Sequence, residues 1–133
     1  MTETPSIQWF PGHMKKTERE IIKSLPLVDI VAELLDARIP ESSQNPVLPS
    51  IIGGKPRFII LNKADMADEK ISREHIAAYR AQGIETLLTD CTTGKGLRQF
   101  EATVRTVLKD KIERMNAKGM AGKTIHVMIV GIP

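Results

Sequence analysis

The chain contains, at residues 58–65, the stretch Phe58-Ile59-Ile60-Leu61-Asn62-Lys63-Ala64-Asp65. Its four apolar residues predict a short strand, and a loop with polar side chains follows it without a break. A strand that is apolar at every position suits a parallel sheet, because such a strand is covered on both faces. The polar side chains then lie at the carboxyl end of the strand, where open parallel sheets bind their ligands.

Further strands and helices are expected on both sides of this stretch. Three other apolar runs predict strands over Leu27 to Leu35, Glu85 to Thr89 and Ile125 to Val130. One helical pattern precedes them, from about Gly12 to Leu25, and three lie between them, over Asn45 to Ile52, over Ser72 to Gln82 and over Leu97 to Lys118. Strands that alternate with helices imply right-handed crossovers, so the fold class is α/β with a mostly parallel sheet.

Several residues are expected to set the helix boundaries. Ser72 has the side chain of a good N-cap, and Gly83 and Gly119 can end helices in the left-handed conformation. Pro26 should end the first helix, because proline cannot continue a helix. Four residues of that helix are expected to share one apolar face: Met14, Ile21, Ile22 and Leu25.

Composition sets broad limits on what the protein is. With 133 residues and 41% apolar residues, the chain can form one domain with its own core. Nineteen Lys and Arg against sixteen Asp and Glu give a net charge of +3, which favours an anionic partner only mildly. The single cysteine, Cys91, can form no internal disulfide, so a reduced compartment is expected. No signal-peptide pattern and no apolar segment of about 20 residues is found, so we expect a soluble protein without membrane contact.

The loop after residue 61 has the chemistry to read guanine. A carboxylate such as Asp65 can accept two parallel hydrogen bonds from the ring N–H and the amino group that guanine presents and adenine lacks. Asn62 can offer its amide to the base, and the aliphatic stem of Lys63 can lie along the ring. The alternative is an ordinary polar loop between a strand and a helix.

Two other strand ends carry glycine-rich loops. Residues 92–96, Thr-Thr-Gly-Lys-Gly, have small side chains that let backbone N–H groups approach the guanine carbonyl oxygen, although such a loop is more often only a turn. Residues 126–133, ending in Gly131-Ile132-Pro133, match a strand that enters a phosphate-binding loop of the pattern G-x-x-x-x-G-K-[ST]. The lysine and hydroxyl residue of that pattern are not among these residues, so the β/γ-phosphate and magnesium contacts are expected outside them.

Four motifs in this order resemble the circularly permuted GTPases, and most closely the YlqF/RbgA family of ribosome-assembly GTPases. They are Trp9-Phe10-Pro11-Gly12-His13-Met14-x-Lys16, Asp36-Ala37-Arg38-Ile39-Pro40, Ser43-x-Asn45-Pro46 and Leu61-Asn62-Lys63-Ala64-Asp65. The resemblance covers nearly the whole chain. In a permuted GTPase the base-recognition motif precedes the phosphate loop, as it does here.

The resemblance implies a Ras-like three-layer P-loop GTPase fold, circularly permuted and partial in this chain. The strand at 125–130 should lie beside that at 27–35, followed by those at 58–61 and 85–89. Residues 1–133 would be the N-terminal portion of a permuted G domain. Asn-Val-Gly-Lys-Ser, the switch regions and a helical C-terminal domain are then expected beyond residue 133.

The resemblance also implies a function. The protein would bind GTP and GDP, use Mg²⁺ held by a residue beyond 133, hydrolyse GTP and assist assembly of the large ribosomal subunit by contacting its rRNA. A monomer in the cytoplasm, or in an organelle matrix if eukaryotic, is expected, and these residues alone should be catalytically inactive. The expected nucleotide-binding residues are Asn62, Lys63, Asp65, Cys91, Thr92, Gly131, Ile132 and Pro133, with no metal ligand among them.

Several residues have more than one interpretation. His13 either replaces the water-orienting glutamine of other GTPases or is a capping or packing residue. Asp36 and Arg38 either touch the phosphate region or brace their own loop, and Glu33 needs a basic partner if it is buried. The aromatic and basic residues near the N-terminus suit an RNA-binding surface and a solvated helix face about equally. They are Trp9, Phe10, Lys15, Lys16, Arg19 and Lys23.

The sequence departs from the family at Asp90-Cys91, where the family usually has Ser-Ala. A backbone contact from Cys91 can persist, but a serine side-chain role at position 90 cannot. The main alternative function is a non-catalytic RNA- or ribosome-docking module on a degenerate G domain, which would lack a following Asn-x-Gly-Lys-Ser/Thr. A more distant alternative is an unrelated flavodoxin-like domain, which would bind no guanine nucleotide.

Overall fold

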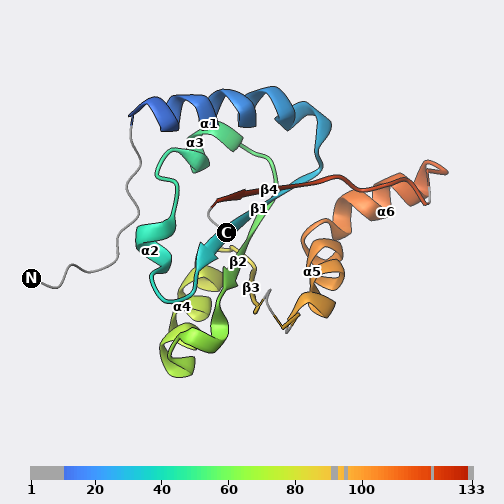
Figure 1. The fold of residues 1–133 in the computed structure, drawn as a ribbon. Helices are drawn as coiled ribbons and strands as arrows, with labels where there is room; N and C mark the ends of the chain where they lie inside the picture. Colours follow the sequence, from blue (N-terminus) through green and yellow to red (C-terminus); the bar gives the residue numbers. More distant parts are fainter. Residues whose placement is uncertain (1–10, 91–92, 95, 121, 132–133) are drawn as a thin grey trace, which may run out of the picture.

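The structure is a computed structural model that describes residues 11–90, 93–94, 96–120 and 122–131. Its sheet consists of β1 (Ile30–Asp36), β2 (Arg57–Asn62), β3 (Thr86–Leu88) and β4 (Val127–Gly131). All pairs of neighbouring strands are parallel, and their order is β3-β2-β1-β4 (Figure 1). The α/β class and the strand order expected from the family resemblance are thus confirmed.

Helices cover both faces of the sheet, which gives three layers (Figure 1). The helices, including short 3-10 turns, are α1 (Pro11–Ser24), η1 (Leu25–Leu27), α2 (Pro40–Ser43), α3 (Leu48–Ile52), η2 (Ala64–Met66), α4 (Glu69–Ala81), η3 (Leu97–Gln99), α5 (Phe100–Val107) and α6 (Lys109–Ala117). The helices α1, α3 and α4 pack on one face of the sheet, and α5 and the start of α6 cover the other. No helix in the described residues is long and apolar enough to cross a bilayer.

Alternate residues of β1 and β2 face opposite layers, as the two-residue period of a strand requires. Ala32 and Phe58 pack against Val104 of α5, and Phe58 meets the ring of Phe100 edge-on at a centroid distance of 5.7 Å. On the other face, Ile59 packs with Tyr79 of α4. This burial on both faces explains why these strands are apolar at nearly every position.

Several predicted boundaries were wrong. Helix α4 begins at Glu69, because the Asp68 carboxylate accepts a hydrogen bond from the Ile71 N–H at 3.1 Å and therefore caps the helix. Ser72 lies within the first turn, where its hydroxyl is buried without a hydrogen-bond partner among the described residues. Gly83, at φ 80°, does end this region in the left-handed conformation, as predicted.

The first helix and the long helix near the C-terminus also differ from expectation. Residues 97–118 form η3, α5 and α6 rather than one helix, with an interruption at Leu108. Leu27 lies in η1 rather than in β1, and α2 was not predicted. Ile22 is 52% exposed, because α1 packs against β1 and α3 only through a narrow apolar stripe that includes Ile21 and Leu25.

Glu33 lies in the middle of β1 and is buried, so its charge needs compensation. The carboxylate accepts a hydrogen bond from the Asn45 N–H at 3.3 Å and lies 3.9 Å from the Arg57 guanidinium. The predicted basic partner is confirmed. Burial nevertheless raises the pKa of Glu33, since the distant ion pair does not fully offset desolvation.

Candidate functional site

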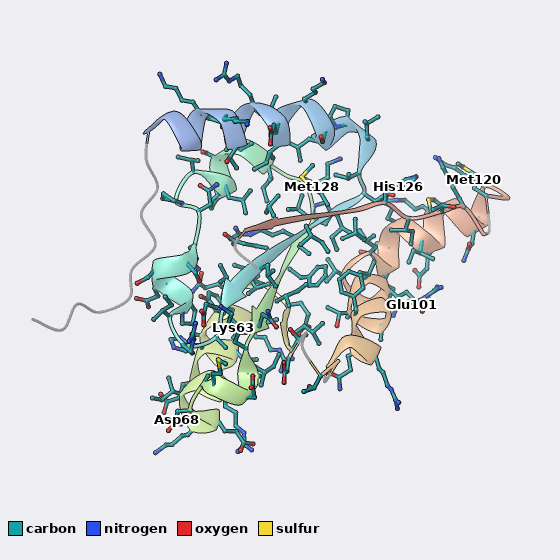
Figure 2. All side chains as sticks on the ribbon, in the orientation of Figure 1. Lys63, Asp68, Glu101, Met120, His126 and Met128 are labelled. Carbon is teal, nitrogen blue, oxygen red and sulfur yellow. The ribbon has the colours of Figure 1, made fainter. Side chains whose placement is uncertain are left out.

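The loop that follows β2 starts in an unusual backbone conformation. Lys63 has φ 63° and ψ 37°, the left-handed region, and η2 begins at the next residue. Asp65 lies in η2 and is exposed, and its carboxylate makes no hydrogen bond or ion pair with the part of the chain that the structure describes. In Figure 2, Lys63 lies near the tip of the β1 arrow, and Asp68 lies lower, where α4 begins.

Thr89, the residue immediately after β3, joins this loop to the next one. Its N–H donates to the Leu61 carbonyl oxygen at 2.8 Å, and its own carbonyl oxygen accepts from the Ala64 N–H at 3.0 Å. Its hydroxyl donates to the side-chain oxygen of Asn62 at 3.3 Å. Sequence reasoning missed Thr89, although its place as the last residue of a predicted strand was a usable signal. The loops after β2 and β3 are therefore held together at one edge of the sheet.

The loop after β3 is braced by Asp90, one of the two residues that depart from the family pattern. The buried Asp90 carboxylate accepts hydrogen bonds from the Thr93 hydroxyl at 2.8 Å and from the Thr93 N–H at 3.4 Å. The Gly94 N–H donates to the Asp90 carbonyl oxygen at 2.8 Å. The aspartate thus accepts bonds from its own loop, as a serine hydroxyl in this place also can. Cys91 and Thr92, which are expected to contact the nucleotide, lie outside the described residues.

Asp36, the last residue of β1, forms the third part of this edge. Its carboxylate accepts three hydrogen bonds from Arg38. The donors are Nε at 3.0 Å, Nη2 at 2.7 Å and the backbone N–H at 2.9 Å. It also lies 3.5 Å from the ammonium nitrogen of Lys63. Asp36 pairs with Asn62 in the register of β1 and β2. Among the described residues, Asp36 and Arg38 therefore brace their loop and bind the one that follows β2.

These contacts shift the ionisation of the two side chains. Hydrogen bonds from the Arg38 side chain, opposed by partial burial, lower the pKa of Asp36 from 3.8 to about 2. The same hydrogen bonds and the charge of Asp36 raise the pKa of Arg38, with a smaller contribution from the charge of Asp65. The guanidinium thus lies within electrostatic range of both carboxylates.

Gly131 ends β4 at the same edge, paired with Leu34 two residues before the end of β1. Its φ is 119°, and a Cβ atom there would lie 2.3 Å from the Leu34 carbonyl oxygen. Only glycine fits this close approach of two backbones. Ile132 and Pro133, the other expected phosphate-loop residues, lie outside the described residues.

The histidines do not gather at this edge. His13 lies in the first turn of α1, and nothing is described of its side chain. His75 lies on α4, and the backbone N–H of His126 donates to Asp29 at 2.8 Å before the start of β4. Among the described residues, no three His, Cys, Asp or Glu side chains form a group that could hold a metal ion. Trp9 and Phe10, from the cluster that suits an RNA-binding surface and a solvated helix face about equally, lie outside the described residues.

The arrangement has the chemistry to recognise a flat heterocycle. It offers an exposed carboxylate on Asp65, a positioned ammonium and aliphatic stem on Lys63, and two tethered loops. The described part contains no metal cluster of acidic or histidine side chains. Side chains of these kinds can recognise a base through hydrogen bonds.

Comparison with known proteins gives close relatives over almost the whole chain. Ribosome biogenesis GTPase A of Bacillus pumilus is 47% identical over 128 residues, which are 96% of this chain and 45% of the relative. The protein of the same name from Priestia megaterium is 47% identical over 129 residues, with 96% and 45% coverage. Mitochondrial ribosome-associated GTPase 1 of Bos taurus is 32% identical over 127 residues, with 95% and 37% coverage. The chain thus spans less than half the length of these curated relatives.

The chain is also similar to two solved structures of YlqF. The chain resembles GNP-bound YlqF from T. maritima with a TM-score of 0.56 and 28% identity, over 89% of this chain and 42% of that one. The GDP-bound structure of TM YlqF matches with a TM-score of 0.56 and 27% identity, over 86% and 42% of the two chains. No protein-family model matches. By sequence, strand order and motif order, the chain is similar to the circularly permuted GTPases of the YlqF/RbgA family.

Proposed function

We propose that this chain is the guanine-reading part of a GTPase that assists assembly of the large ribosomal subunit. The observation that carries the proposal is the joining of two loops at the carboxyl edge of the sheet. Thr89 bonds to Asn62 and Ala64, so the loop with Asp65 is joined to the chain immediately before Asp90. Open parallel sheets bind ligands at this edge.

Each side chain of the first loop has a proposed role. The Asp65 carboxylate accepts two parallel hydrogen bonds from the ring N–H and the amino group of guanine. The stem of Lys63 lies against one face of the ring, and the Asn62 amide supports both the base and the neighbouring loop. Backbone N–H groups of Cys91 and Thr92 donate to the guanine carbonyl oxygen. Adenine has neither the ring N–H nor the carbonyl, so it is rejected.

The phosphates would be bound mainly by residues that follow this chain. The relatives are about twice as long, and the family pattern predicts Asn-Val-Gly-Lys-Ser after Pro133. We propose that residues 1–133 are the N-terminal portion of the G domain, that the remaining motifs lie beyond, and that Gly131, Ile132 and Pro133 begin the phosphate-binding loop. Mg²⁺ would neutralise phosphate charge, and its protein ligand is expected among the later residues.

Support for the nucleotide and the partner comes from the relatives. YlqF structures are described as GNP-bound and GDP-bound, so GTP and GDP are the proposed ligands. The curated relatives are named for ribosome biogenesis or ribosome association. We infer that GTP orders the switch segments for binding to the large subunit and its rRNA, and that hydrolysis releases them. The cytoplasm, or an organelle matrix in a eukaryote, follows as the site of action.

His13 is the proposed catalytic residue of this chain. Its Pro-Gly-His-Met motif opens α1, and the family lacks the glutamine that orients water in other GTPases. A His13→Ala variant of the full-length protein should hydrolyse GTP more slowly while it binds GDP normally.

Guanine recognition can be tested in the full-length protein by calorimetric titration. The protein should bind GDP at least about 100-fold more tightly than ADP, and Asp65→Ala should lose most of that preference, because a charged hydrogen-bond acceptor is removed. Asp68→Ala is the matched control, since it removes a nearby carboxylate that caps α4. Equal binding of GDP and ADP by the unaltered protein would overturn the proposal.

A further inference from the structure

We propose that Asp36 is a positioning residue for guanine recognition, which acts by holding the side chain of Lys63 in place before the base arrives. The inference rests on the proposed function, since it assigns Lys63 to the face of the base. It concerns the last residue of β1, to which that proposal gives no contact with the nucleotide.

Asp36 itself is held rigidly. Its backbone N–H donates to the buried Ser43 hydroxyl at 3.1 Å, and that hydroxyl donates to the Pro40 carbonyl oxygen at 2.9 Å. The Ala37 N–H donates to the Asn62 carbonyl oxygen at 2.7 Å. The residue is 8% exposed. Its carboxylate therefore occupies a defined place beside the start of the loop that follows β2.

Two cations share this carboxylate. Arg38 bonds to both of its oxygens, and the Lys63 ammonium lies 3.5 Å from Oδ2. Hydrogen bonds from Arg38 and the charges of both cations lower the pKa of Asp36, so its carboxylate stays charged beside Lys63. Asp36 thus holds the Lys63 ammonium at the end of β1.

The backbone of Lys63 shows why such an anchor matters. Its left-handed conformation sets the direction in which the side chain leaves the chain. A free lysine side chain loses rotamer freedom when it is ordered, and a side chain that is ordered beforehand removes this cost from ligand binding. An anchored ammonium fixes both ends of the stem, so the stem forms a ready surface for one face of the base.

A double-mutant cycle in the full-length protein tests this. Asp36→Asn keeps the shape and the acceptor for the Arg38 N–H but loses the charge, and Lys63→Met keeps most of the stem but loses the ammonium. Each variant should bind GDP about three- to tenfold more weakly, because the stem is no longer ordered. The double variant should be no weaker than the weaker single variant, since both changes remove the same contact. The preference for GDP over ADP should survive in all three, because Asp65 is intact.

The binding is measured at a temperature at which circular dichroism shows each variant fully folded. This separates positioning from a purely structural role, which would lower the melting temperature and leave GDP affinity unchanged. Unchanged affinity in folded Asp36→Asn, or fully additive losses in the double variant, would overturn the inference. If the unaltered protein shows no preference for GDP over ADP, the proposed function fails and the inference fails with it.

Discussion

Lys63 is, within the described residues, the only one besides glycine with a positive φ. A left-handed conformation costs an ordinary residue about 1–2 kcal/mol, and glycine or asparagine usually occupies it. Hydrogen bonds on both sides maintain it here, from Ala64 to Thr89 and from Met66 to the Lys63 carbonyl oxygen. The sequence could not predict this conformation, because lysine gives no local sign of it.

Asp36 should make the stability of the chain sensitive to acid. Its pKa falls from 3.8 to about 2 on folding, so its stabilising effect is complete above about pH 4 and is lost as the pH falls towards 2. A shift of nearly two units corresponds to roughly 2 kcal/mol. Urea unfolding of the chain and of Asp36→Asn, compared between about pH 5 and pH 2, should show a stability difference that shrinks by about this amount. A difference that does not change with pH would contradict the assignment.

Among the elements, α4 depends on Asp68 as its N-cap. Asp68→Ala should lower the free energy of unfolding by about 1 kcal/mol, because the Ile71 N–H loses its acceptor. Glu69→Ala is the matched control, since the exposed pair of Glu69 with Arg73 contributes only a few tenths of a kcal/mol. Chemical denaturation measures the free energy of unfolding of both variants. Equal losses would show that Asp68 acts through its charge alone and not through the cap.

The loop after β3 contains two glycines that differ in their surroundings. Both have positive φ, 79° at Gly94 and 85° at Gly96. A Cβ atom at Gly96 would lie 2.2 Å from the Leu88 carbonyl oxygen, whereas a Cβ atom at Gly94 would have no described atom within 4 Å. Gly94→Ala should cost about 1 kcal/mol for backbone strain alone. Gly96→Ala should cost clearly more, because the backbone must also shift. Comparable melting temperatures for the two variants would contradict this close approach.

The elements themselves were largely predictable, and their boundaries were less so. Apolar runs located all four strands, because burial on both faces leaves a strong signal in the sequence. The start of α4 was missed, since both Asp68 and Ser72 are good N-caps and only the structure shows which one bonds. The interruption at Leu108 carries no sequence signal, because the apolar stripe continues through it.

At the scale of the whole molecule, the sequence predicted where the site would form but not how its parts are joined. Parallel strands bring their carboxyl ends to one edge, so Asn62, Asp36 and Gly131 were expected together. The hydrogen bonds between loops depend on strand register and side-chain packing, and no local sequence pattern predicts either of these. The contacts of Thr89 with Asn62 and of Asp36 with Lys63 are of this kind.

We propose that guanine is recognised at this edge through the Asp65 carboxylate. Xanthine has a carbonyl oxygen where guanine has its amino group, so an asparagine side chain can donate to it where the aspartate carboxylate cannot. Binding of GDP and of xanthosine diphosphate should therefore be titrated for the full-length protein and its Asp65→Asn variant. The substitution should weaken GDP binding by about 10- to 100-fold and make the xanthine nucleotide the preferred ligand. An Asp65→Asn protein that still prefers GDP to the same extent would contradict the claim.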